Sequence, residues 1–339
     1  MTKKDNKTSK YNTKSERIKY KYRNHLRGVG QKDEKTIIAI LRHIRDFEVY
    51  LDFEGFEKFN DAVAGKYIQH MVNNDLSTSY ITGNIRAVKD FLIWLERQNG
   101  YRSKINYNDI EHLNISRNQR RAAKASPYKK AYTYPDILKA IRQMSEKTDK
   151  DKRDKAMVSL QALCTLRISE LRTVKMRNVI EEDGIYFIDI CPKDIQSKFA
   201  KQRQAVFIPL GEDILKNVIS WYEYLKSLGF KDDDPLFPKI NNRFNQHNLL
   251  EQSIKRDTIK SNTTIRNVFK KTFESAGFEY INPHSFRKTL ARFAQTHSPA
   301  FMNAVRQNLG HSSIDTTLNS YGQLSLYDQR QIIASQNMI

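Results

Sequence analysis

The sequence has little of the residues that cross-link or interrupt a chain. Its 339 residues include two cysteines, Cys164 and Cys191, too few for a disulfide scaffold or a four-cysteine zinc site. Glycine, at 12 residues, and proline, at 8, are also scarce, which favours a mostly helical chain. No apolar run approaches the roughly 18 residues of a membrane-spanning helix, and Met1–Lys10 lacks the apolar core of a secretion signal. We therefore expect a soluble, helix-rich protein that stays in the cytoplasm.

Positive charge, by contrast, is in large excess. Lysine and arginine number 58 and aspartate and glutamate 38, so the net charge is +20. A folded chain with that charge repels itself and attracts polyanions, and phosphate contacts give it affinity for nucleic acid of any sequence. Hydrophobic residues make up 39% of the chain and aromatic residues 11%, which excludes wholesale disorder. The charge points to a nucleic acid partner, with a merely solubilising charge or ribosome-like RNA binding as the alternatives.

Helical periodicity dominates the first third of the chain. Residues 1–15 are polar and basic, and we expect a flexible tail there. Beyond the tail, apolar residues recur at steps of three and four, which is the period of a helix with one buried face. The predicted helices cover residues 36–51, residues 61–73, a segment that Ser77 caps, and Asp109–Leu113. They predict a compact helical domain over residues 16–113.

A basic linker is predicted over residues 114–130. From Ser116 onward it contains no acidic residue. A solvated linker would have this composition, and so would a strap that lies along a DNA backbone. The residues that we expect to bind DNA phosphates are Arg117, Arg120, Arg121, Lys124, Lys129 and Lys130.

The remaining chain predicts a second domain over residues 131–325, followed by a tail over residues 326–339. Val179-Ile180, a turn at Asp183-Gly184 and Ile185–Ile190 form a predicted hairpin, and Ala205–Leu210 a third strand. Residues 238–261 are polar and give no assignment. The predicted helices run from Pro135 to Glu146 and over residues 152–171, 211–228, 263–276, 284–296 and 299–308.

Two segments of this domain place charged residues among apolar ones. Arg167 is flanked by Leu166 and Ile168, and Glu170, three residues on, would share its helical face and could orient it. His284 and Arg287 stand three positions apart at the start of an expected helix, where both would point the same way and anions are favoured. Taken singly, Arg167 is better explained as a snorkelling surface residue or a buried, paired one, and a His-x-x-Arg spacing often occurs by chance.

In order, these segments resemble the tyrosine recombinase (phage integrase) family, of the type found in mobile elements. The matching pieces are Leu166–Leu171, a lysine before the third strand, His284–Arg287, Leu309–His311 and, ten positions after His311, Tyr321. The resemblance covers residues 131–325 and, more loosely, residues 16–113, which are similar to the family's helical core-binding domain. It implies a mainly α fold, with a SAM-like helical domain and an α-rich catalytic domain that carries a small three-stranded antiparallel sheet.

The resemblance also implies a role for each matching residue. Tyr321 would attack the phosphorus and form a 3′-phosphotyrosine, while Arg167 and Arg287 would clamp the non-bridging oxygens. His284 would assist proton transfer, and His311 would hydrogen-bond the phosphate. Because the covalent link preserves the bond energy, we expect no ATP, no metal and no other cofactor.

The general acid and the nucleophile each have a rival. A Lys-x-x-Lys-x-Arg run similar to the family's begins at Lys198, which we expect to be the acid, with Lys201 second and a DNA-contacting loop lysine as the alternative. Tyr327 could replace Tyr321, but its spacing from His311 is less typical of the family. Thr165 departs from the family pattern, which commonly has glycine at this position.

The expected function is site-specific recombination that integrates or excises a mobile element. The expected partners are double-stranded DNA at the recombination site, a homotetramer on paired sites and an accessory DNA-bending or excision factor, with no membrane. A type IB topoisomerase-like enzyme and a catalytically inactive DNA-binding regulator on the same fold are the alternatives. A metal-dependent nuclease is disfavoured because His284, His297 and His311 lack a His-Glu-x-x-His spacing.

Overall fold

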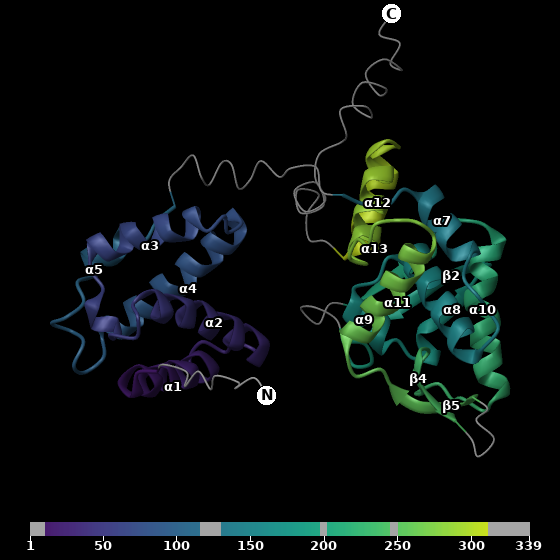
Figure 1. Ribbon diagram of the computed structural model, residues 1–339. Helices are drawn as coiled ribbons and strands as arrows, with labels where there is room; N and C mark the ends of the chain where they lie inside the picture. The colour runs from purple at the N-terminus through teal and green to yellow at the C-terminus, as the bar shows by residue number, and fades with distance from the viewer. Residues whose placement is uncertain (1–10, 116–129, 197–201, 245–249, 311–339) are drawn as a thin grey trace, which may run out of the picture. The chain divides into compact units, whose positions relative to one another are not determined.

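The computed structural model describes residues 11–115, 130–196, 202–244 and 250–310 (Figure 1). It divides into two compact units, residues 1–125 and 126–339, and each has its own hydrophobic core. Within the described ranges, no helix is both long and apolar enough to cross a membrane. The predicted linker over residues 114–130 falls largely outside those ranges, as does the predicted tail over residues 326–339.

The first unit is entirely helical over its described residues. Its α-helices are α1 (Thr13–Gly28), α2 (Glu34–Tyr50), α3 (Asp61–Asn73), α4 (Thr78–Glu96) and α5 (Tyr107–Glu111). The last four confirm the predicted helices, and Ser77 caps α4 by accepting a hydrogen bond from the backbone N–H of Tyr80. The apolar faces of α2 and α4 meet in a core that includes Ile44, Phe47 and Phe91.

The helix α1 corrects the prediction of a tail over residues 1–15, because it begins at Thr13. The side chain of Asn12 caps it by accepting hydrogen bonds from the backbone N–H groups of Lys14 and Ser15. Ile18, Tyr22 and Leu26 lie four residues apart and are buried. Lysine and arginine between these three positions dilute the apolar pattern, which is why the sequence alone did not reveal the helix.

The second unit is built around a central, mostly buried helix. Its α-helices are α7 (Tyr134–Arg142), α8 (Asp149–Cys164), α9 (Ile168–Thr173), α10 (Glu212–Ser227), α11 (Asn262–Ser275), α12 (Ser285–Gln295) and α13 (Pro299–Leu309). The buried helix α8 runs beside α10 (Figure 1). The prediction of one continuous helix over residues 152–171 is wrong, because α8 ends at Cys164 and α9 starts only at Ile168.

Two small antiparallel sheets complete the second unit. Strands β1 (Val179–Glu182), β2 (Ile185–Ile190) and β3 (Arg203–Val206) lie in the order β1-β2-β3, which confirms the predicted three-stranded sheet, although β3 starts before Ala205. The left-handed backbone of Asp183 and Gly184 forms the predicted tight turn. A second hairpin, β4 (Pro238–Phe244) and β5 (Leu250–Thr258), occupies the stretch that gave no assignment, and it corrects the expectation of a single sheet.

The packing of α1 predicts different effects for two tyrosines on the same helix. Tyr22 is 3% exposed and packs edge-on against Phe91, whereas Tyr20 is 64% exposed. We expect Tyr22→Ala to lower the opening free energy of the first unit by about 3 kcal/mol, and Tyr20→Ala to change it by less than about 0.5 kcal/mol. Hydrogen exchange of the backbone amides in α1 and α2 measures both effects. Equal exchange in the two variants would show that α1 is not part of this core.

Candidate active site

The loop between α8 and α9 brings Arg167 and Glu170 together. Arg167 is the residue that precedes α9. The sequence had suggested instead that it lies within a helix. Glu170 has no exposed surface; its Oε2 accepts a hydrogen bond from the backbone N–H of Arg167 and its Oε1 accepts one from Nη1 of the same residue, both at 2.8 Å. The predicted contact is therefore made, but it is made as a cap on the first turn of α9.

Thr165 produces the bend between the two helices. Its backbone is left-handed, with φ +48° and ψ +49°, a conformation that strains a β-branched residue. The expected glycine of the family would adopt it without strain, so the departure from the family pattern lies at the position where backbone freedom is most needed. The hydroxyl Oγ1 is buried and has no hydrogen-bond partner among the described residues.

Arg287 joins the ends of two helices. It lies in α12 and is 1% exposed. Its Nη1 donates to the carbonyl of Thr165 at 2.8 Å, and its Nη2 donates to the carbonyl of Leu309, the last residue of α13. Both carbonyls end helices and lack a partner within them, so they carry partial negative charge that a guanidinium compensates. Nη2 of Arg167 reaches the same Leu309 carbonyl at 3.5 Å.

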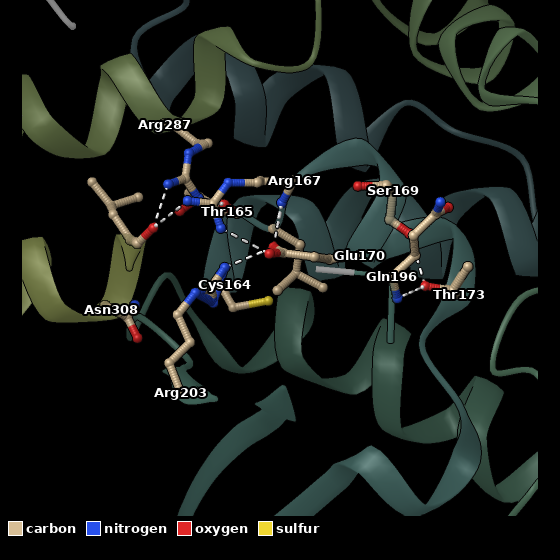
Figure 2. Close-up of polar contacts among 12 residues, drawn as sticks. Cys164, Thr165, Arg167, Ser169, Glu170, Thr173, Gln196, Arg203, Arg287 and Asn308 are labelled. Carbon is tan, nitrogen blue, oxygen red and sulfur yellow. Dashed lines mark hydrogen bonds and ion pairs between the residues drawn. The ribbon is translucent and has the colours of Figure 1, made fainter. Parts of the chain in front are cut away.

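A third arginine, Arg203, belongs to the site and was not predicted (Figure 2). It begins β3, and its Nη2 donates to Oε2 of Glu170 at 2.6 Å. The Lys-x-x-Lys-x-Arg run, of which it is the last residue, was the signal that could have found it. Gly310 lies against it: a methyl group at Gly310 would stand 2.6 Å from Nε and 2.7 Å from Cδ of Arg203, so a larger residue there would have to displace the Arg203 side chain.

Burial and mutual charge shape the ionisation of these groups. Burial, together with the positive charges of Arg287 and Arg167, lowers the pKa of Arg203 to about 10, against the opposing effect of Glu170. Burial raises the pKa of Glu170, but Arg203 and Arg167 outweigh it and hold that pKa below its ordinary value. Arg203 and Glu170 are therefore both charged near neutral pH, and three arginines with one glutamate give the cluster a formal net charge of +2.

The other predicted residues are only partly within the described ranges. His284 precedes α12 and is exposed. Lys130 is exposed and forms an ion pair with Glu279 at 2.6 Å, in which both side chains are 70% exposed. The residues that lie outside the described ranges are Tyr321, His311, Lys198, Lys201, Arg117, Arg120, Arg121, Lys124 and Lys129. Among the described residues no group of three or more histidines, cysteines, aspartates or glutamates could hold a metal ion.

Comparison with known proteins identifies the second unit. Residues 131–326 match the sequence model of the phage integrase family, and this span contains all four members of the charged cluster and Tyr321. The chain belongs to the phage integrase family. It is a tyrosine recombinase, an enzyme that cleaves and rejoins DNA strands.

Proteins of related sequence match most of the length of this chain. A probable integrase/recombinase of Aquifex aeolicus is 26% identical over 326 residues, which are 89% of this chain and 94% of the relative. Transposase A from transposon Tn554 of Staphylococcus aureus is 24% identical over 306 residues, 84% of this chain and 77% of the relative.

Two solved structures of lambda integrase share the fold. A dimer bound to a COC′ core site has a TM-score of 0.63 at 16% identity and covers 91% of this chain and 95% of its own. A tetramer bound to a Holliday junction has a TM-score of 0.60 at 15% identity, and the match covers 88% of this chain and 77% of the lambda integrase chain. The predicted fold class, mainly α with a small three-stranded sheet, is confirmed.

The close contact of Gly310 with Arg203 predicts that alanine is more destabilising at Gly310 than at a glycine with the same backbone conformation and free space around it. Gly310 and Gly184 both have left-handed backbones, with φ +68° and +75°, but a methyl group at Gly184 would meet nothing within 4 Å. We expect Gly310→Ala to destabilise the second unit by about 1–3 kcal/mol more than Gly184→Ala does, because only the first displaces Arg203. Chemical denaturation measures both. A similar loss of stability in the two variants would mean that the Arg203 side chain moves aside at little cost in free energy.

Thr165 predicts a stabilising substitution. Thr165→Gly removes a β-branched residue from a left-handed backbone and removes a buried hydroxyl without a described partner. We expect the free energy of unfolding to rise by about 1 kcal/mol, since glycine offsets part of the gain through its unfolded-state entropy. Thermal unfolding checks it, with Thr272→Gly inside α11 as a control that should destabilise. A loss of stability on Thr165→Gly would contradict the strain at this turn.

Proposed function

We propose that this tyrosine recombinase is a site-specific integrase of a mobile element, which cuts and rejoins double-stranded DNA through a 3′-phosphotyrosine without metal or ATP. The observation that carries the proposal is the meeting of Arg167 and Arg287 at the Leu309 carbonyl. These two arginines come from distant segments, and they converge beside the Gly310 that leads to His311. Two guanidinium groups that converge on one point form a site suited to one phosphodiester.

The arginines would stabilise the charge that develops on the phosphate. The side chain of Arg167 is 23% exposed, so it would meet a non-bridging oxygen first, and the buried Arg287 would add its charge from beneath. Removal of such a preorganised cation commonly slows a phosphoryl or acyl transfer by about 10²–10³-fold. Glu170 orients Arg167 from the side away from solvent.

The proton transfers and the nucleophilic attack are assigned to the other residues that match the family motif. Tyr321 would attack the phosphorus, and the 5′-oxygen would leave with a proton from Lys198 or, failing that, Lys201. The exposed position of His284 before α12 suits a role in proton transfer, and His311 would donate a hydrogen bond to the phosphate. No step in this scheme needs a cofactor.

DNA binding and assembly extend beyond the site. We assign core-site binding to the first unit and backbone contacts to the basic residues of the linker (Arg117, Arg120, Arg121, Lys124, Lys129 and Lys130). The similar lambda integrase was solved as a tetramer on a Holliday junction, which supports a homotetramer on paired sites. The similarity to a Tn554 transposase supports the mobile-element role.

The proposal predicts a covalent protein–DNA adduct that depends on one tyrosine. Wild type, Tyr321→Phe and Tyr327→Phe are mixed with sheared DNA of the source organism in EDTA, stopped in detergent, and the attached DNA is sequenced. We expect adducts with wild type and Tyr327→Phe and none with Tyr321→Phe. Tyr321→Phe should still bind the recovered site with near-normal affinity, because the hydroxyl is needed for the chemistry alone.

Each other outcome overturns a named part of the proposal. An adduct with Tyr321→Phe would move the nucleophile elsewhere, and adducts that form only without EDTA would show that a metal is required. Relaxation of supercoiled DNA without exchange between two sites would favour the topoisomerase-like alternative. Binding without cleavage at a site found by binding alone would favour the inactive regulator.

A further inference from the structure

Glu170 is shared between two arginines, and this sharing has an electrostatic consequence. Arg167 and Arg203 both bond to its carboxylate, which has no exposed surface (Figure 2). If Arg167 were its only partner, the pair would be neutral, and Arg167 would offer little net charge to an anion. With Arg203 present, the three groups carry one net positive charge, and Arg167 is the member that reaches solvent.

Arg203 differs from an arginine that serves only the fold. Arg153 is similarly buried in the same unit, and its three guanidinium nitrogens all donate hydrogen bonds, to Asp154 and to the carbonyl of Pro238. The side chain of Arg203 is 8% exposed, yet its Nη1 is buried without a hydrogen-bond partner in the described part of the chain. Within the described residues the hydrogen bond of the Arg203 guanidinium goes to Glu170, so the position of Arg203 is tied to that carboxylate.

The surroundings of Arg203 hold it in place from two sides. Gly310 packs against its Nε and Cδ, at distances where a larger residue would have to displace the Arg203 side chain. Three residues on, the backbone of Val206 exchanges two hydrogen bonds with the side-chain amide of Asn308, at 2.6 and 3.1 Å, which attaches β3 to the end of α13. A flexible side chain held this firmly keeps its charge at a fixed distance from Glu170.

We propose that Arg203 is a positioning residue of the recombination site, which acts through Glu170 by neutralising that carboxylate so that the charge of Arg167 is left for the DNA phosphate. The inference rests on the proposed function for the identity of that anion. It assigns to Arg203 no contact with the DNA. Loss of its charge therefore weakens the chemical step, because the field at the phosphate falls, and leaves the initial binding of DNA unchanged.

The test is a charge-restoring double substitution. Arg203→Gln lowers the net charge of the cluster from +2 to +1, whereas Arg203→Gln with Glu170→Gln restores +2, and a glutamine at 170 keeps an oxygen to cap α9. The probe is a nicked duplex of the sequence recovered by covalent trapping, and the readouts are the single-turnover rate of adduct formation and, by fluorescence anisotropy, the affinity for DNA. We expect Arg203→Gln to react about 10- to 100-fold more slowly with unchanged affinity, and the double variant to recover at least tenfold. Arg203→Lys should lie close to wild type.

Arg153→Gln is the matched control. It removes an equally buried arginine with a carboxylate partner outside the site, so we expect lower stability but a wild-type rate at a temperature where every variant is folded by circular dichroism. If wild type itself forms no adduct, the proposed function fails. If wild type reacts and Arg203→Gln reacts within twofold of it, or is slow with no recovery in the double variant, the role of Arg203 through charge is wrong. If Arg153→Gln is equally slow, the effect is structural and the inference is again wrong.

Discussion

Glu170 is a carboxylate without exposed surface, and the geometry of the clustered arginines depends on how its charge is compensated. Burial of an ionised carboxylate costs several kcal/mol unless charges and hydrogen bonds replace the lost water. Here Arg167 supplies a backbone N–H and a guanidinium, and Arg203 supplies a second guanidinium. Because the two arginines come from the turn before α9 and from the start of β3, the carboxylate is compensated only when helix and sheet are both in place.

The same dependence extends to α12 and α13 through unpaired helix carbonyls. Helices end with carbonyl groups that no later turn can satisfy. In this enzyme Arg287 bonds to such groups at Thr165, just beyond the end of α8, and at Leu309, the last residue of α13. The negative ends of two helices therefore help to hold this buried arginine in place.

Helical periodicity and the ordered motif allowed much of this architecture to be predicted. The stripe of Ile81, Ile85 and Val88 is a regular apolar face, and α4 has the predicted cap at Ser77. Arg167 and Arg287 were identified by matching residues to the family, and their contacts agree with a shared site. The helix is local in sequence, so one segment was enough to reveal it, whereas the two arginines became recognisable only from the order of several segments.

Features that depend on contacts between distant segments were missed. The backbone of Thr165 is left-handed because the chain must reverse between α8 and α9, and threonine gives no sign of that conformation. Arg203 is one lysine or arginine among several in a basic stretch, and only the approach of Glu170 and Gly310 distinguishes it. The helix α1 and the β4–β5 hairpin were hidden because charged and polar residues are interspersed among their few buried positions.

The amide of Asn308 has a consequence for the edge of the sheet. In the order β1-β2-β3, the described part of the chain gives strand β3 one neighbour, so its other side carries backbone groups that no described strand pairs with. Asn308 uses both the N–H and the carbonyl of Val206, as a neighbouring strand would. An incoming strand can therefore pair with β3 at Val206 only after the end of α13 has moved away. Any lengthening of the sheet at this edge would then also displace the residues that precede His311 in the chain.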